Sequence, residues 1–415
     1  MRTIAFWLSL GLVFTIPWEA VVEYPALGSV TRLIGFAVAA FWVLTVAVTD
    51  RIRKPAPFQL AVSLFVVWNA ISVMWSANAD RTTEHLVTWA QLLILTFIVW
   101  DLYTTRAAMM AGLQMYILGA YVALGNTLVN FFSGRTFYYE RFSAAGTNPD
   151  DLGSVLALGI SVAWYLAASK RTQKWPQLLK WVNYAYIPAA LMGIALSGTR
   201  TALIAAIPGV VFGLTSLSRL RLSVRVAIFL LLILAVVNLL PLIPQASLQR
   251  LGTTGNELTS GDLNGRVHLW TQGLVSFVER PLLGIGSNMY RSVNTEGKVA
   301  HNSFISVLVE LGLIGLILFG IILAMVVIQA WHQPRWDRLF WLSILAAWAV
   351  AASTLTWEYR KPTWLFLSFV IASSALASQR AEGVQLVRRN EPDVQFNREP
   401  RLSNHPDEQE QRSLA

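Results

Sequence analysis

The chain has 415 residues, of which 55% are hydrophobic and only 13% charged, and its formal net charge is +9. Soluble domains carry roughly 25% charged residues, so this composition excludes an ordinary soluble protein. The chain contains no Cys, which excludes disulfides, thiol catalysis and cysteine-ligated metals. One membrane-spanning helix needs about 20 mainly apolar residues, and such runs recur along the whole sequence. We therefore predict an all-α polytopic integral membrane protein.

The apolar runs predict about twelve transmembrane helices, an even number that leaves both termini on one side. Short loops on that side carry slightly more Lys and Arg than the opposite loops, and such loops are usually cytoplasmic. Residues 244–303, between the ninth and tenth spans, are predicted to form a helical loop on the outer side. Residues 1–378 are predicted to be one transmembrane domain, and residues 379–415 a charged, disordered cytoplasmic tail. The predicted spans are 4–21, 31–49, 57–76, 86–103, 108–131, 151–168, 182–198, 201–217, 225–243, 304–330, 339–357 and 363–378.

Positive charge on the outer side runs against the usual topological bias. These cations either bind an anionic substrate or are ordinarily solvated and contact lipid phosphates. Arg200 is a specific case, because "ALSGTRTALIAA" (195–206) joins two spans through almost no loop. We expect Arg200 at the outer membrane face between packed helices. It either snorkels to the interface or binds substrate in the space beside Ser197 and Gly198.

The outer loop contains "GDLNGRVHLWTQGLVSFVERPLLGIGSNMY" (261–290), which predicts an amphipathic helix on the membrane face or over a cavity. Asp262 or Asn264 is expected to cap this helix, and Pro281 is expected to end it. The apolar stripe is predicted to consist of Val267, Trp270, Leu274, Phe277 and Val278.

The helical period of about 100° per residue decides which polar residues of this helix lie near the stripe. Arg266 borders the stripe in the first turn, where free N–H groups favour an anion, so Arg266 is predicted to be functional. His268 points away and is expected to be a solvated surface residue. Gly284 and Gly286 in "LLGIGS" are interpreted as a tight turn rather than a phosphate-binding loop.

The tenth span opens with "GKVAHNSFISVLVELGLIG" (297–315). His301 stands where a polar loop meets an apolar helix, either as a functional residue or as an interface residue, and Asn302 is a good N-cap. Glu310 lies deeper, where a carboxylate is costly unless it faces a cavity or a partner. It either orients a cation or is protonated and hydrogen-bonded between helices. The sequence has no His pair at i, i+4 and no Asp-x-Asp in the outer loops, so no metal or other cofactor is predicted.

Three motifs in this order, "SGTR", "NGRVHLWTQG" and "HNSFISVLVELGLIG", resemble the O-antigen ligase family of the Wzy superfamily. A fourth, "RFSAAGTNPDDLGSVLALG" (141–159), is similar to the family's N-P-N start of a middle span, with Asp150 where Asn is more usual. The resemblance covers most of the chain, in span number, in the single large outer loop and in the order of two Arg and one His.

This resemblance implies a GT-C-like glycosyltransferase of the bacterial inner membrane with its active site facing the periplasm. Such an enzyme moves a finished polysaccharide en bloc from undecaprenyl pyrophosphate to a sugar hydroxyl of lipid A–core, without a metal and with inversion. The expected partners are this glycan donor, this acceptor and membrane lipids, and no nucleic acid. The family's two functional arginines correspond to Arg200 and Arg266, and its histidine to His301.

These residue types fit the chemistry independently of the resemblance. An arginine fork binds phosphate oxygens with a permanent charge, and a histidine titrates in the range that a general base needs. The hypothesis is that Arg200 and Arg266 hold the pyrophosphate while His301 deprotonates the acceptor hydroxyl. Glu310 and Asn302 are possible supporting residues of this site.

Three other functions stay open at this point. A Wzy-type polymerase of O-antigen or exopolysaccharide uses the same donor chemistry with a lipid-linked glycan as acceptor. A protein O-oligosaccharyltransferase fits less well, because the C-terminal tail is short. A polysaccharide transporter would be expected to show inverted repeats and charges at mid-membrane, whereas the candidate charges here gather at the outer face.

Overall fold

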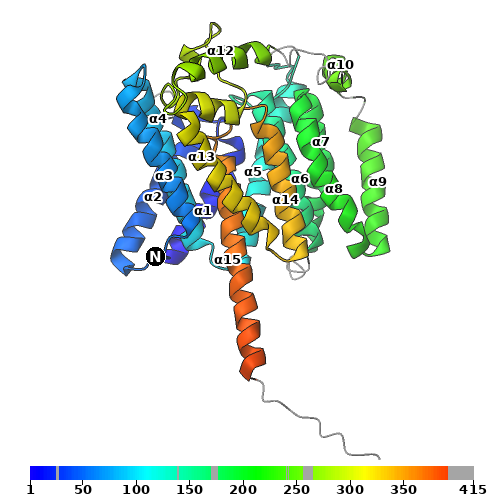
Figure 1. Cartoon of the computed structure of the whole chain (residues 1–415). Helices are drawn as coiled ribbons and strands as arrows, with labels where there is room; N and C mark the ends of the chain where they lie inside the picture. Colours follow the sequence, from blue (N-terminus) through cyan, green and yellow to red (C-terminus); the bar gives the residue numbers. More distant parts are fainter. Residues whose placement is uncertain are drawn as a thin grey trace, which may run out of the picture. The chain divides into compact units, whose positions relative to one another are not determined.

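Helices of the computed structural model occupy all twelve predicted spans (Figure 1). The structure describes residues 1–24, 28–137, 140–169, 176–239, 241, 243–255 and 265–390. Most predicted span boundaries lie within a few residues of a helix end, because Pro, Gly and N-cap side chains mark those ends. The exceptions include the span 86–103, whose helix begins at Ala79, and the span 363–378, whose helix continues to Asn390. The helices are α1 (Arg2–Thr15), α2 (Val30–Thr49), α3 (Pro57–Ile71), α4 (Ala79–Leu102), α5 (Arg106–Phe132), α6 (Pro149–Ala168), α7 (Gln177–Ser197), α8 (Arg200–Ser216), α9 (Leu222–Leu239), α13 (Ser303–Trp331), α14 (Arg335–Ala352) and α15 (Lys361–Asn390).

Shorter elements lie between these helices. The loop between α9 and α13 carries α10 (Gln245–Gly252), α12 (Arg266–Glu279) and the 3₁₀ turn η6 (Tyr290–Ser292). Strands β1 (Glu23–Tyr24) and β2 (Gly28–Ser29) form a small antiparallel hairpin with Glu23 opposite Ser29. Three further 3₁₀ turns are η1 (Ile16–Trp18), η2 (Ser72–Trp75) and η4 (Leu217–Arg219).

Six helices of the described residues are long and apolar enough to cross a membrane by length and composition. They are α2, α3 with η2, α4, α5, α6 and α13, and two shorter apolar helices are α1 with η1 and α8. The protein is therefore an all-α membrane protein, as predicted. The full number of twelve spans and the GT-C-like fold stay predictions.

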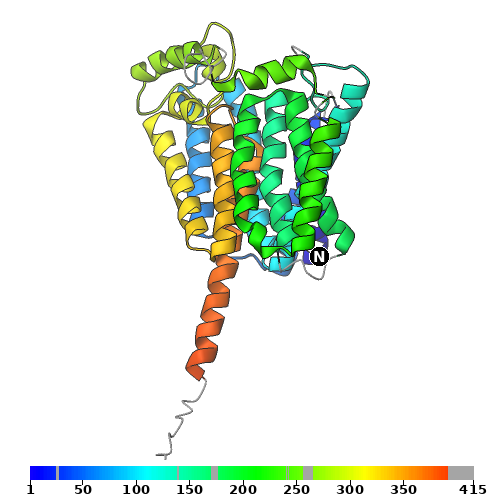
Figure 2. The same ribbon diagram turned by 90° about the vertical axis from the view of Figure 1, so that its right-hand side faces the viewer.

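One end of the helix bundle carries α10 and α12, and the N-terminus lies at the other (Figures 1 and 2). We call the first the α12 end. Helix α6 is the most deeply buried of the long helices, with almost every side chain from Leu152 to Ala167 enclosed, and it packs against α5, α7, α8 and α14. It begins at the α12 end, so Asp150 and Asp151 in its first turn lie there.

Helix α13 is broken at Gly312, which has φ 68° and ψ −168°. The loop after α12 fills this break: the Leu313 N–H donates to Pro281 O (2.8 Å), and the Gly286 N–H donates to Glu310 O (2.9 Å). A Cβ atom on Gly312 would lie 2.2 Å from Leu282 O, so only glycine permits this approach. Gly286 (φ 106°) turns within the loop, which confirms the predicted tight turn.

The chain divides into two units, Met1–Ala377 and Ser378–Ala415. Helix α15 continues to Asn390, into the predicted tail. Residues 391–415 of that tail, and residues 256–264 of the outer loop, lie outside the described residues.

Candidate active site

The three residues predicted to act together all lie at the α12 end, although they come from separate parts of the chain. Arg200 is the first residue of α8, Arg266 the first of α12, and His301 immediately precedes the N-cap of α13. Helix α12 is fixed onto the segment before His301, because the Trp270 indole N–H donates to Ala300 O (2.8 Å). Arg266 and His301 are thereby brought to the same place.

The start of α12 differs from the prediction. Its N-cap is Gly265 with φ 80°, and not Asp262 or Asn264, which lie outside the described residues. A left-handed conformation at this position favours glycine over a side chain that could cap. The helix still begins at Arg266, so the first-turn position predicted for this arginine is correct.

The apolar stripe of α12 was predicted only in part. The buried residues are Leu269 and Gly273, because Tyr290 packs flat on Gly273 and donates its hydroxyl hydrogen to Leu269 O (2.9 Å). The buried face of α12 is the one where Tyr290 approaches Gly273 closely, and not the one that carries the bulkiest side chains. Arg266 lies on the same face, because it precedes Leu269 by three residues and Gly273 by seven. Trp270 and Phe277 are half-buried, whereas Val267, Leu274 and Val278 are exposed.

Arg266 is half-buried and makes no hydrogen bond or ion pair to the described residues. Burial lowers the pKa of Arg266, the Asp150 carboxylate opposes that shift, and the Arg141 charge adds to it. An arginine keeps its charge in any such site. Its donors are therefore charged and available for an anion. His268 is exposed and bonds Gln272 (2.7 Å), as predicted for a surface residue.

Arg141 forms a buried junction that was not predicted from the sequence. Its Nη2 lies 2.5 Å from Asp150 Oδ1 and 2.9 Å from Thr199 Oγ1, and its Nε donates to Ser197 O (2.7 Å). The carboxylate that replaces the usual Asn at position 150 thus ties the start of α6 to the turn before Arg200. The proximity of "RFS" to "NPDD" is the sequence signal that could have indicated this pair.

Arg200 contacts α10. Its Nε donates to Arg250 O (2.8 Å) and its Nη2 to Thr253 Oγ1 (2.7 Å), so it satisfies the C-terminal end of α10. The space predicted beside Gly198 is filled, because a Cβ atom there would lie 3.2 Å from Ser247 Oγ of α10. Arg200 does not line the cavity of His301 described next, and its role as a pyrophosphate ligand stays a prediction.

His301 lines a cavity of about 270 Å³. It adopts φ 49°, in the left-handed region, and its backbone N–H donates to Thr356 Oγ1 (3.1 Å). A left-handed conformation is uncommon for a residue other than glycine, and strained residues gather at functional sites. The rest of the lining is Asn148, Asp151, Arg291, Gly297, Lys298, Val299, Leu355, Thr356, Tyr359 and Arg360.

Burial lowers the pKa of His301 below its ordinary value of 6.5, and the Arg266 charge lowers it further. Asp150 and Asp151 act in the opposite direction, and Lys298 adds to the lowering. The imidazole is therefore neutral at neutral pH, which is the form that can accept a proton. The same electrostatic couplings show that His301 lies close enough to Arg266 to sense its charge.

Asn302 is the N-cap of α13, as predicted. Its Oδ1 accepts from the N–H groups of Phe304 (3.0 Å) and Ile305 (3.1 Å), and its Nδ2 donates to Ser353 O (3.0 Å). These bonds fix the backbone directly after His301. Asn302 thus positions the helix mouth and lies next to the cavity without lining it.

Glu310 anchors the loop that fills the break in α13. Its Oε2 accepts from the Asn288 N–H (2.8 Å) and its Oε1 from the Tyr290 N–H (3.0 Å). Both oxygens accept from backbone donors of the loop, a contact not foreseen from the sequence, and the two predicted roles stay predictions. Glu310 supports the site through the loop and does not line the His301 cavity.

We expect Glu310→Gln to lower the free energy of unfolding by about 1–3 kcal/mol, because the new amide NH₂ would face a buried backbone N–H that then lacks an acceptor. Denaturant unfolding of the purified protein in detergent measures this loss. The matched control is Glu84→Gln, an exposed glutamate of α4, which should leave stability unchanged. Equal stability of the two variants would contradict the anchoring role.

Asp151 and Arg360 form the wall of the cavity opposite the loop. Asp151 Oδ1 accepts from the Trp357 indole N–H (2.7 Å), and Oδ2 accepts from Arg360 Nη2 (3.2 Å). Lys361 pairs with Glu19 beside them. This group was not predicted from the sequence. No cluster of three or more potential metal ligands occurs among the described residues.

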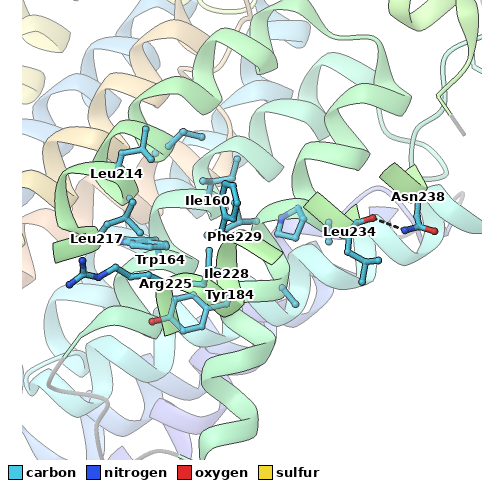
Figure 3. Close-up of a pocket in the computed structure, with 17 residues that line it drawn as sticks. Ile160, Trp164, Tyr184, Leu214, Leu217, Arg225, Ile228, Phe229, Leu234 and Asn238 are labelled. Carbon is cyan, nitrogen blue, oxygen red and sulfur yellow. Dashed lines mark hydrogen bonds between the residues drawn. The ribbon is translucent and has the colours of Figure 1, made fainter. Parts of the chain in front are cut away.

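A second, larger cavity of about 810 Å³ lies between α6, α7, α8 and α9 (Figure 3). Its lining is almost wholly aliphatic and aromatic, with Trp164, Leu214 and Phe229 among the labelled side chains. Arg225 and Asn238 lie towards opposite ends in Figure 3. This cavity contains none of the predicted site residues, and its chemistry suits an apolar chain.

Comparison with known proteins agrees with the resemblance seen in the motifs. Residues 185–320, which include Arg200, Arg266 and His301, match the family model described as O-Antigen ligase. These matches support a relationship of this helical membrane protein to the Wzy/O-antigen ligase superfamily. It is similar to the exopolysaccharide production protein ExoQ of Rhizobium meliloti, with 25% identity over 290 residues, which cover 64% of this chain and 63% of ExoQ. The chain therefore spans less than two thirds of that relative.

Proposed function

We propose that the protein is an O-antigen ligase of the bacterial inner membrane. It would transfer a polysaccharide en bloc from undecaprenyl pyrophosphate to a sugar hydroxyl of lipid A–core on the periplasmic face, with both termini in the cytoplasm. The observation that carries the proposal is the neutral His301 beside Arg266, whose charged donors have no partner among the described residues. A base and an anion-binding group at one membrane face are what this transfer needs.

The reaction follows from these two side chains. The acceptor hydroxyl loses its proton to the His301 imidazole while its oxygen attacks the anomeric carbon of the donor sugar. The bond from that carbon to the pyrophosphate oxygen breaks on the opposite face, so the configuration inverts. Arg266 stabilises the negative charge that grows on the leaving pyrophosphate. No cofactor is required by this sequence of steps.

Arg200 is proposed to be a second ligand of the pyrophosphate. Helix α8 starts at Arg200 and continues along the apolar cavity of Figure 3, where Gly209 and Leu214 line the wall. A donor whose prenyl chain occupied that cavity would have its head group towards the start of α8. Arg200 would then exchange a bond to α10 for one to phosphate.

A polymerase of exopolysaccharide or O-antigen is the alternative function, favoured by the similarity to ExoQ, an exopolysaccharide production protein. Deleting the gene, resolving lipopolysaccharide on a gel and assaying lipid-linked glycan would separate the two. Loss of the whole ladder with long polymer accumulating on the lipid carrier supports the ligase. Core that bears a single repeat supports an O-antigen polymerase, and unchanged lipopolysaccharide rejects both O-antigen functions.

The rate of transfer should fall at acid pH with an apparent pKa below 6.5, because protonated His301 cannot accept a proton and its pKa is lowered by burial and Arg266. Asp150 raises that pKa, so Asp150→Asn should move the acid limb to still lower pH. Initial rates from pH 4.5 to 8 with purified protein measure this. An acid limb above 6.5 in both proteins would contradict a buried base.

A further inference from the structure

The cavity of His301 carries more positive than negative charge. Arg291, Lys298 and Arg360 line it, and Asp151 is the one carboxylate in the lining described above. Lys298 pairs with exposed Glu296 (2.6 Å), and Arg360 pairs with Asp151 (3.2 Å). Arg291 is exposed and makes no hydrogen bond or ion pair to the described residues. The guanidinium of Arg291 is thus available to bind an anion.

Arg360 is preorganised for such an anion. Asp151 holds one Nη, and the guanidinium lies 5.5 Å from the centre of the Tyr359 ring. Its Nε is buried and has no hydrogen-bond partner in the described part of the chain. A buried donor without an acceptor costs free energy unless something binds it. This is a second observation, independent of the net charge, that points to a ligand.

The cavity is separate from the group that would hold the leaving pyrophosphate. Neither Arg200 nor Arg266 lines it, and Arg266 instead lies by Asp150 and Arg141. His301 therefore shares the cavity with Arg360 and is influenced by the charge of Arg266, which does not line the cavity. The substrate that gives its proton to His301 is the acceptor, so the acceptor is the substrate that enters this cavity.

We propose that the cavity is an acceptor subsite that binds a carboxylate or phosphate group carried by the acceptor sugar. Arg291 and Arg360 determine this specificity, and Asp151 is a positioning residue for Arg360. A volume of about 270 Å³ is just below the roughly 300–1,000 Å³ of pockets for drug-sized ligands, and suits one sugar ring with its substituent. The inference rests on the proposed function, because it takes His301 as the base.

The test uses the purified full-length protein and two acceptors that differ in one group: an oligosaccharide ending in a uronic acid, and the same oligosaccharide after reduction of its carboxyl group to the alcohol. Arg291→Gln should raise the KM for the acidic acceptor roughly tenfold or more, since a bond to a charged group is lost. The KM for the reduced acceptor and the KM for the lipid-linked donor should not change. Arg81→Gln, an exposed arginine of α4 outside the cavity, is the matched control.

Asp151→Asn tests the positioning role. It should raise the KM for the acidic acceptor more than the KM for the reduced acceptor, whereas damage to the fold would affect both acceptors alike. A higher KM for the donor in Arg291→Gln, with the acceptor unaffected, would overturn the proposal and assign the cavity to the pyrophosphate.

Direct binding separates this inference from the proposed function. Methyl glucuronide and inorganic phosphate are titrated calorimetrically into wild type and Arg291→Gln. Binding of either anion that weakens in the variant supports the site, and absence of binding for both overturns it. Binding without any glycan transfer would reject the proposed function while the anion site stands.

Discussion

His301→Ala is expected to lower the rate of glycan transfer by a factor of roughly 10²–10⁴, the usual contribution of a general base. The acceptor hydroxyl would have to lose its proton to water, while Arg266 and the cavity stay in place. The measurement is kcat with saturating donor and acceptor. Because His301 has φ 49°, His301→Asn is the second variant, since asparagine tolerates the left-handed region well.

The control for this prediction is His268→Ala, because His268 is exposed on α12 and bonds Gln272. It should leave kcat unchanged. If both variants of His301 retained kcat within about twofold of wild type, far from the factor expected of a base, the assignment would be wrong. A residual rate that no longer falls at acid pH would strengthen it, because the titrating group would have been removed.

Arg266→Gln should lower kcat by roughly 10²–10³, as is typical when one donor to a developing negative charge is removed. Gln keeps a polar group of similar length but loses both the charge and the fork that bind phosphate oxygens. Arg266→Lys keeps the charge and should recover only part of the rate. Single-turnover measurements isolate the bond-breaking step that this arginine is proposed to assist.

Two comparisons make the Arg266 result specific. Arg135→Gln changes an exposed arginine between α5 and α6 and should have no effect on kcat. Arg200→Gln removes bonds to Arg250 and Thr253, so it should loosen α10 whether or not Arg200 binds phosphate. A loss of rate in Arg135→Gln as large as in Arg266→Gln would point to a general effect of surface charge and would sink the assignment.

Helix positions could be predicted because apolar length, Pro and N-cap residues act locally. "NPDD" begins α6 with Asn148 as N-cap, and "HNSF" begins α13 with Asn302. The break in α13 could not be predicted in this way, because Gly312 looks like any glycine in an apolar run. Its conformation depends on Leu282, thirty residues earlier, whose carbonyl oxygen occupies the space a side chain would need.

The position of a site residue could be predicted from the sequence where that residue stands at the start of its own helix. Helix α12 folds back onto the segment before α13, because Trp270 bonds Ala300 O, so the starts of both helices lie at one end of the bundle; the joint role of Arg266 and His301 stays a prediction. The contacts of Arg200 could not be predicted in this way, because its guanidinium donates to the backbone of a separate helix, α10. The pairs Arg141–Asp150 and Asp151–Arg360 each join an arginine of a loop to the first turn of α6. The hydrophobic pattern of a single segment does not predict which residues of two segments form an ion pair.

The break in α13 has a consequence for how the molecule opens. The amide of Ile285 donates to Val309 O and that of Leu313 to Pro281 O, so the loop and the transmembrane helix share one hydrogen-bond ladder across the break. A segment of this kind unfolds with the core and not before it. The loop beside the site is therefore fixed to α13, and it cannot lift away without breaking the hydrogen bonds that complete this helix.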